Sequence, residues 1–146
     1  MIRVVFLIVL FVFNVWGLYK YVQLQIDPSD ALEALKKLSN KEAKLTSNFL
    51  IVMIGVVYAV ILSLNSLIVP SYFLTVTLII CAAIELCLIF FLFHRSTELY
   101  SGSVEEVTKK YLANLKSFYS VISFIWNIAE TGIIGATIYL ILKELA

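Results

Sequence analysis

Residues 47–93 read SNFLIVMIGVVYAVILSLNSLIVPSYFLTVTLIICAAIELCLIFFLF and contain two apolar runs separated only by Pro70 and Ser71. Each run, 47–69 and 72–93, is close to the ~20 residues that a helix needs to cross a bilayer. Proline lacks the backbone N–H that would continue a helix, and serine is a favoured N-terminal cap. The stretch therefore predicts a tight antiparallel hairpin of two membrane-spanning helices, with Pro70 ending the first and Ser71 capping the second.

Two further apolar runs, residues 2–19 and 118–142, are also long enough to cross a membrane. Hydrophobic residues make up 62% of the 146-residue chain and charged residues only 14%, whereas about a quarter of a soluble domain is charged. The sequence thus predicts an all-α fold, an integral membrane four-helix bundle with antiparallel helices in a lipid bilayer. Its length suits a single multi-pass membrane domain covering residues 1–146.

The N-terminal run has a second interpretation. Arg3, the apolar stretch after it and Val15-Trp16-Gly17 resemble a secretory signal followed by a cleavage site. Cleavage would place the next, lysine-rich segment outside the cell, against the charge bias described below. We therefore expect an uncleaved membrane anchor.

Basic residues gather in two of the segments between spans. Nine of the eleven lie either between the first and second spans or between the third and fourth. Cytoplasmic loops of membrane proteins carry an excess of lysine and arginine. We expect both lysine-rich loops in the cytoplasm, and both termini and the Pro70 turn on the outside.

The first of these loops contains a short helical signal. Asp27 and Pro28 form a typical helix start, and leucines at positions 32, 35 and 38 alternate with charged residues. The pattern predicts an amphipathic helix over residues 28–38. It would lie on the cytoplasmic membrane surface, or it would be an ordinary connecting helix packed on the bundle.

Two capping signals flank the spans. Ser39-x-x-Glu42 and Ser103-x-x-Glu106 both match the capping box. Gly102 suits a left-handed residue that ends the third span. The second, third and fourth spans are therefore expected to continue into the cytoplasm as short helical extensions.

The fourth span carries a polar stripe along one helical face, because its polar residues recur at steps of three and four. An acid at mid-membrane depth costs roughly 3 kcal/mol on insertion scales, so it should face protein or water. The stripe consists of Lys116, Ser120, Ser123, Asn127, Glu130 and Thr137, with Tyr119 beside it.

The other spans each offer one hydrogen-bonding group at a depth similar to that of Glu130, namely Asn14, Tyr58 and Glu85. Such a layer can be a structural clasp between helices, each contact contributing ~0.6–2 kcal/mol. It can also be a proton or cation path, because intramembrane acids recur in such paths. If the two acids face each other, they would titrate as a coupled pair.

Small residues on two spans predict close helix contacts. Gly132, Gly135 and Ala136 cluster on the back of the fourth span, and the second span carries Gly55-xxx-Ala59. Small residues four apart let membrane helices approach closely. With a polar face and a small-residue face, the fourth span is either fully surrounded in the monomer or shared with another subunit. We expect a homo-oligomer or a subunit of a larger membrane complex.

Several kinds of site are not expected. Cys81 and Cys87 lie six residues apart on nearly opposite helical faces and cannot share a metal, and His94 is the single histidine. There is no phosphate-binding loop, dinucleotide motif or serine triad signature. We therefore expect no metal, no cofactor and no enzymatic activity, and the net charge of +1 gives no reason to expect nucleic acid.

The leading hypothesis is a small oligomeric membrane protein that conducts or translocates a cation, or protons. An alternative is a non-catalytic subunit, or an immunity-type membrane protein, that docks onto the transmembrane helices of a partner. A third is a membrane-perturbing effector. In the leading hypothesis the path consists of Glu130, Glu85, Asn127, Ser123, Ser120, Thr137, Asn14 and Tyr58.

Overall fold

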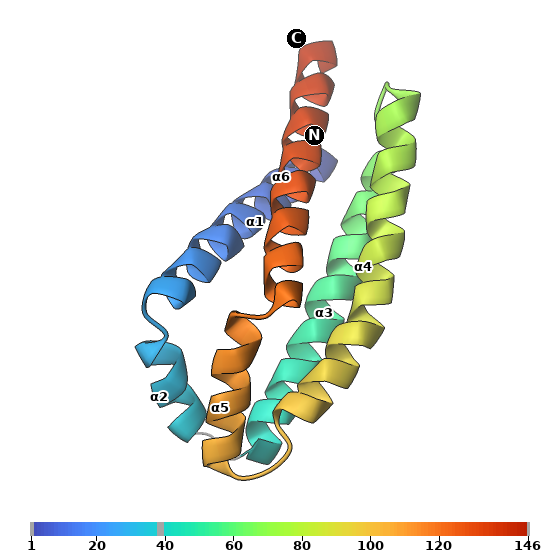
Figure 1. The fold of residues 1–146 in the computed structure, drawn as a ribbon. Helices are drawn as coiled ribbons and strands as arrows, with labels where there is room; N and C mark the ends of the chain where they lie inside the picture. Colours follow the sequence, from blue (N-terminus) through green and yellow to red (C-terminus); the bar gives the residue numbers. More distant parts are fainter. Residues whose placement is uncertain (1, 38–39, 146) are drawn as a thin grey trace.

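The computed structural model describes residues 2–37 and 40–145, which form six α-helices and no strand (Figure 1). Four of the helices are long and apolar enough to cross a membrane, which confirms the all-α fold with four candidate spans. The helices are α1 (Ile2–Ile26), α2 (Ser29–Lys37), α3 (Asn40–Ser66), α4 (Tyr72–Leu99), α5 (Val104–Leu115) and α6 (Phe118–Leu145).

The four long helices alternate in direction. Helices α3 and α4 form the predicted hairpin and lie side by side, while α1 contacts α6 and α3 (Figure 1). The connection between α3 and α4 lies at the same end of the bundle as both termini, and we call this the turn end. Helices α2 and α5 lie at the opposite end, called here the α2/α5 end.

The hairpin turn is wider than predicted, because α3 ends at Ser66 rather than next to Pro70. The amide of Asn65 donates to the Ile61 carbonyl, and the Ser66 hydroxyl donates to the Ser63 carbonyl. These side chains bond to the last turn, where such bonds compete with regular helix geometry. Ser71 does occupy the N-cap position of α4, but its side chain makes no capping hydrogen bond.

The first span is longer than predicted, because α1 continues to Ile26 rather than ending near Tyr19. The predicted helical extensions of the second and third spans are confirmed, since α3 begins at Asn40 and α4 continues to Leu99. The extra turns are amphipathic, so apolar run length alone does not detect them. Gly102 has a positive φ of 108°, but it lies in the loop beyond the end of α4 rather than capping it.

The predicted continuation of the fourth span is wrong, because α5 and α6 are separate helices. The Ser103–Glu106 capping box is present and starts α5. Helix α5 ends at Leu115 and α6 begins at Phe118. The Ser117 hydroxyl accepts from the backbone N–H of Ser120 in the first turn of α6. Lys116 therefore lies in the turn and not on the polar face of α6. The other predicted box includes Ser39, which lies outside the described residues.

Helix α2 matches the amphipathic segment predicted for residues 28–38, of which Leu38 lies outside the described residues. The Asp27 carboxylate accepts from the backbone N–H of Ser29 at 2.9 Å, as a helix cap does. Hydrogen bonds from the Ser29 side chain and backbone lower the pKa of Asp27. Helix α2 contacts α5, which agrees with the alternative of a connecting helix packed on the bundle.

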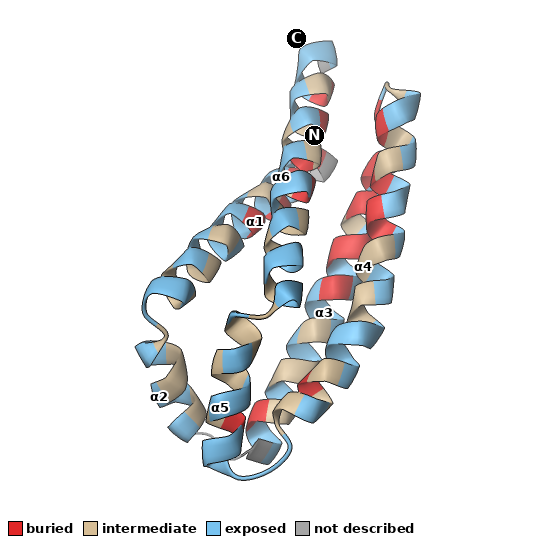
Figure 2. Cartoon of the chain, in the orientation of Figure 1, coloured by how far each residue is buried: buried red, intermediate tan, exposed pale blue. Residues whose placement is uncertain are grey.

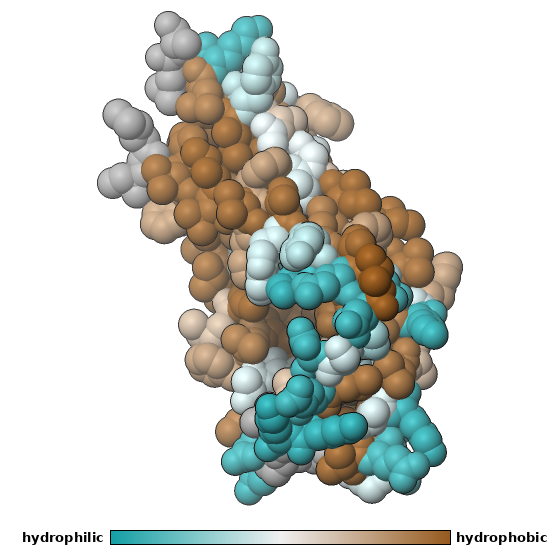
Figure 3. Space-filling view, turned by 90° about the vertical axis from the view of Figure 1, so that its left-hand side faces the viewer, coloured by the Kyte–Doolittle hydropathy of each residue, from teal (hydrophilic) through white to brown (hydrophobic). Residues whose placement is uncertain are grey.

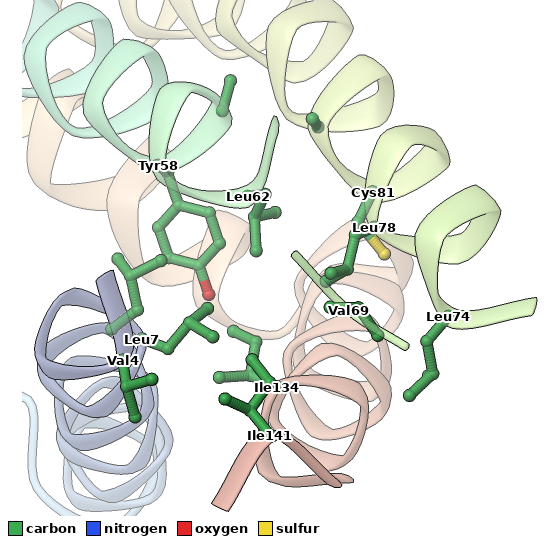
Figure 4. Packing of buried hydrophobic residues seen from close by; sticks show 13 residues of the cluster. Val4, Leu7, Tyr58, Leu62, Val69, Leu74, Leu78, Cys81, Ile134 and Ile141 are labelled. Carbon is green, nitrogen blue, oxygen red and sulfur yellow. The ribbon is translucent and has the colours of Figure 1, made fainter. Parts of the chain in front are cut away.

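Buried residues concentrate in the half of the bundle near the turn end (Figure 2). All four long helices contribute to this cluster, with Leu7, Leu62, Leu78 and Ile134 fully buried (Figure 4). Hydrophobic side chains also cover much of the outer surface, while hydrophilic ones gather toward the α2/α5 end (Figure 3). Such an apolar exterior is the expected surface of a protein that lies in lipid.

The small residues are used in different ways. A β-carbon added to Gly55 would lie 2.5 Å from Cγ1 of Ile89, so α4 approaches α3 closely there. A β-carbon on Gly135 would lie 3.2 Å from the Phe11 ring, so α1 packs against this position. Gly132 and Ala136 are exposed, and nothing lies within 4 Å of an added carbon at Gly132. Gly55 thus lies at the close contact between α3 and α4, whereas Gly132 and Ala136 are exposed on the surface.

We expect two helical glycines to differ in whether a larger side chain can replace them. We expect Gly55→Val to destabilise the protein by about 1–3 kcal/mol, because the new side chain would overlap Ile89. Gly17 lies on α1 with nothing within 4 Å, so Gly17→Val should change stability by less than about 0.5 kcal/mol. Reversible unfolding in mixed detergent micelles measures both, and equal effects would contradict the close approach.

Candidate functional site

Glu130 is the more buried of the two acids in the middle of the membrane-spanning helices. Its side chain is 1% exposed, and its Oε1 atom has no hydrogen-bond partner in the part of the chain that the structure describes. An unpartnered carboxyl oxygen in an apolar interior is costly, since burial removes its hydration. The Glu130 carboxyl is therefore the candidate site of the membrane-spanning helices.

Three helices contribute to a polar cluster around this group. The Asn14 amide of α1 donates to the Tyr58 hydroxyl of α3, and that hydroxyl lies against the Glu130 carboxyl of α6. Asn14 and Tyr58 are themselves buried, at 5% and 4% exposed. The structure thus brings together three of the four groups predicted to share one layer.

The fourth group, Glu85, shares no hydrogen bond with this cluster in the described structure and has a partner of its own. Glu85 is half-buried, and its Oε1 atom accepts from the indole N–H of Trp126 at 3.2 Å. Trp126 precedes Glu130 by one turn of α6, toward the α2/α5 end. The two acids interact electrostatically but have separate partners.

The polar stripe of α6 does not form a continuous lining. Ser123 and Thr137 each lie seven residues from Glu130, almost two full turns, and so share its helical face. Thr137 is buried and donates to the Ile133 carbonyl of its own helix, whereas Ser123 is exposed. Asn127 is half-buried. This face of α6 is therefore buried from Glu130 toward the turn end and more exposed from Glu130 toward the α2/α5 end.

Helix packing explains this change. From Glu130 toward the turn end, α6 has several buried positions, including Ile134 and Ile141, whereas residues 118–129 have none. On α1, likewise, no residue after Asn14 is buried. Helices α1 and α6 are thus covered near the turn end and separate from their neighbours toward the α2/α5 end, whereas α3 and α4 stay side by side (Figure 1).

Two cavities lie in the half where the helices separate. One of about 520 Å³ lies among α2, α3, α4 and α5 and is lined mainly by apolar side chains, with Glu85 the only acid among its described lining residues. The other, of about 410 Å³, is lined by Ser120, Ser123 and Trp126 of α6 together with residues of α1 and α4. Neither cavity includes Glu130 in its lining. Polar groups thus approach Glu130 from the α2/α5 end, and a packed apolar cluster separates it from the turn end.

Tyrosines lie at the outer part of the first cavity. Tyr100 and Tyr111 line it beyond the end of α4, and burial raises the pKa of both phenols. Both hydroxyls therefore remain protonated over the ordinary pH range and can donate hydrogen bonds. They add hydrogen-bonding groups to a space that is lined mainly by apolar side chains.

Two side chains that hydrogen-bond to predicted site residues could not be identified from the sequence. Trp126 binds Glu85, and the Tyr21 hydroxyl accepts from the Ser120 hydroxyl at 3.2 Å. Tyr21 and Trp126 lie on other helices than their partners, so their spacing along the chain does not reveal the contacts. His94 is exposed and pairs with Glu98 on its own helix. Within residues 2–37 and 40–145, no three His, Cys, Asp or Glu side chains gather as a metal site.

No family model matches the chain, and no curated protein or solved structure proves similar to it.

The polar cluster predicts a specific stability effect. Tyr58→Phe removes the hydroxyl that Asn14 and Glu130 both contact, and leaves their polar atoms buried without it. We expect a loss of about 1–3 kcal/mol in unfolding free energy. Tyr72→Phe is the matched control, because Tyr72 is 85% exposed and should change stability by less than about 0.5 kcal/mol. Equal losses in detergent unfolding would mean that the cluster contributes nothing specific.

Proposed function

We propose that this protein translocates protons or another small cation across a membrane, with Glu130 as the central binding group. The observation that carries the proposal is the buried Glu130 carboxyl with one oxygen unpartnered in the described structure. Intramembrane acids that face the bundle interior recur in proton relays and cation sites. Tyr58 and Asn14 would orient the carboxyl, and no enzymatic activity is implied.

The one-sided surroundings of Glu130 support this proposal. Ser120, Ser123 and Asn127 lie toward the α2/α5 end, where the helices separate, with Glu85 on the neighbouring helix α4. The opposite side is filled by apolar side chains such as Leu7, Leu62 and Ile134. A site that is approached from one side and closed on the other suits a transporter in one of two alternating states. Thr137 would join the path only after this apolar region opens.

Charge bias gives the proposed direction of access. The lysine-rich segments lie at the α2/α5 end, and cytoplasmic loops carry such an excess. The termini and the hairpin turn would then lie outside. Glu130 would exchange its proton or cation with the cytoplasm in the arrangement described above.

Flux measurements test the function directly. We expect liposomes containing the wild-type protein to show proton or potassium flux, and Glu130→Gln to reduce it to the level of protein-free liposomes. Glutamine keeps the size of the side chain but cannot exchange a proton or carry a negative charge. Glu144→Gln is the matched control, since Glu144 is exposed near the end of the same helix.

The alternatives give distinct results. Unchanged flux in Glu130→Gln would remove Glu130 from the path, and no flux from correctly inserted wild-type protein would refute translocation. In the second case Glu130, Tyr58 and Asn14 would be a clasp between helices. The variants are compared only after circular dichroism and gel filtration show that both fold.

A second candidate function is docking onto the transmembrane helices of a partner, or onto further copies of the chain. The observation that favours it is the open face of α6, where Gly132 and Ala136 are exposed. Small residues four apart are typical of close contacts between membrane helices. We propose a homo-oligomer through this face, because it would also leave the Glu130 face directed into each bundle.

This association predicts a site-specific effect of a bulky residue. Gly132→Leu should convert the oligomer to monomers in mild detergent, because leucine would hold the two backbones apart. Gly17→Leu provides the control, since Gly17 is equally free of neighbours but lies on α1. Light scattering of the purified protein measures the mass. A stable stoichiometric foreign partner would instead favour the subunit role, and a wild-type monomer would refute the oligomer.

A further inference from the structure

Two cavities meet at one arginine near the end of α4. Arg95 and Asn114 line both the 410 Å³ cavity between α1, α4 and α6 and a second cavity of about 460 Å³. The second cavity is lined by polar groups of α5 and of the segment after α4, including Ser101, Lys110 and Ser117. The first is lined mainly by apolar side chains, including Ile84, Leu88 and Ile122, with Ser120 and Ser123 on its α6 side. The guanidinium group of Arg95 thus lines both cavities. We call the 460 Å³ cavity the polar compartment and the 410 Å³ cavity the apolar compartment.

The positive charge of Arg95 is not neutralised by any carboxylate in the described residues. Its Nη2 atom donates to the Asn114 side-chain oxygen and to the Ser117 hydroxyl, the latter at 3.3 Å. The guanidinium carbon lies 4.7 Å from the centroid of the Tyr119 ring. These neutral neighbours fix the orientation of the group and leave its charge available. A half-buried, oriented guanidinium suits the recognition of a phosphate, which it can bind through two hydrogen bonds.

Lys110 adds a second uncompensated cation in the polar compartment. Its ammonium group donates to the backbone carbonyls of Glu98 and Ser101 and to the Ser101 hydroxyl. The Glu98 carboxylate also lines this compartment, lies 3.4 Å from His94, and is the only acid among the described lining residues. Two cations therefore face one carboxylate, and the compartment favours an anion.

The depth of this site matches the membrane surface. Arg95 follows Tyr72 by 23 residues of continuous α4, which at 1.5 Å per residue is about 35 Å. The hydrocarbon core of a bilayer is about 30 Å thick, so the guanidinium reaches the level of lipid headgroups. Leu88 and Ile84 lie two and three turns deeper, within the hydrocarbon region.

We propose that this site binds an anionic phospholipid of the surrounding membrane, with its phosphate at Arg95 and Lys110 and an acyl chain along the apolar cavity. Basic pockets between membrane helices on the cytoplasmic side are known to bind such headgroups. The volume of the apolar compartment, about 410 Å³, lies in the range of small-ligand sites. This inference goes beyond the proposed function, because it concerns a lipid and does not depend on cation translocation.

Native mass spectrometry of the detergent-solubilised protein tests the site. The protein is mixed with phosphatidylglycerol or phosphatidylcholine of identical acyl chains, and the lipid-bound fraction is measured. We expect phosphatidylglycerol to bind preferentially, and Arg95→Gln to weaken that binding about tenfold, as expected for loss of a charge-assisted contact. Lys110→Gln should weaken it less, because the ammonium is more exposed than the guanidinium.

The matched control is Lys109→Gln, which removes the same charge one residue away. Lys109 pairs with Glu105 at 3.1 Å on the exposed side of α5 and lines neither compartment. Equal loss in Lys109→Gln and Lys110→Gln would reduce the effect to general surface charge and overturn the site. If Arg95→Gln does not fold, the comparison of the two lysine variants decides the question alone.

A further comparison separates a lipid from a free phosphate compound. Glycerol phosphate, which has the headgroup chemistry without acyl chains, should displace phosphatidylglycerol only weakly. Displacement at concentrations equal to those of the lipid would mean that the apolar compartment contributes nothing, which would overturn the proposal. Equal binding of phosphatidylglycerol and phosphatidylcholine would overturn it as well.

Discussion

The burial of Glu130 is the constraint on which the arrangement of α6 depends. Exposure of a carboxyl group to the middle of a bilayer costs roughly 3 kcal/mol, so the helix must turn this face toward the other helices. Once Glu130 faces inward, Ile134, Thr137 and Ile141 follow it into the interior, because they lie four, seven and eleven residues further along. Gly132 and Ala136 are then placed on the outside. One polar residue thus determines both the core of the turn end and the face that remains open.

The second determining feature is the separation of the helices toward the α2/α5 end. Ser123 lies on the same face of α6 as Thr137, yet Ser123 is exposed and Thr137 is buried. The difference comes from neighbouring helices rather than from α6 itself. Where the helices separate, half-buried acids and hydroxyls such as Glu85 and Ser120 find individual partners in Trp126 and Tyr21. The polar groups therefore form a tight cluster only around Glu130 and a looser set beyond it.

Much of this fold follows from local signals in the sequence, and the exceptions have physical causes. The hairpin, the four spans, the Ser103–Glu106 capping box and the close approach at Gly55 all depend on residues near each other in the chain. The break between α5 and α6 could have been found, because Ser117 has the residue type of an N-cap. The partners of Glu85 and Ser120 could not, since they are set by the relative rotation and depth of whole helices. For the same reason, the sequence places four polar groups at similar depth but does not show that Asn14, Tyr58 and Glu130 gather while Glu85 binds Trp126.

The two proposed sites bear on each other, because the cavity assigned to an acyl chain is also one of the two spaces that lie toward the α2/α5 side of Glu130. An acyl chain along Leu88 and Ile122 would exclude water from the space beside Ser120 and Ser123. Access to Glu130 from the α2/α5 end would then depend on the other cavity, in which Glu85 is the only acid. Glu85 would in that case be the first proton-exchanging group on the route, and Glu130 the second. A lipid at Arg95 would thus leave one polar route to Glu130 rather than two. Glu85 would then exchange protons on that route, although it lies apart from the Asn14–Tyr58–Glu130 cluster.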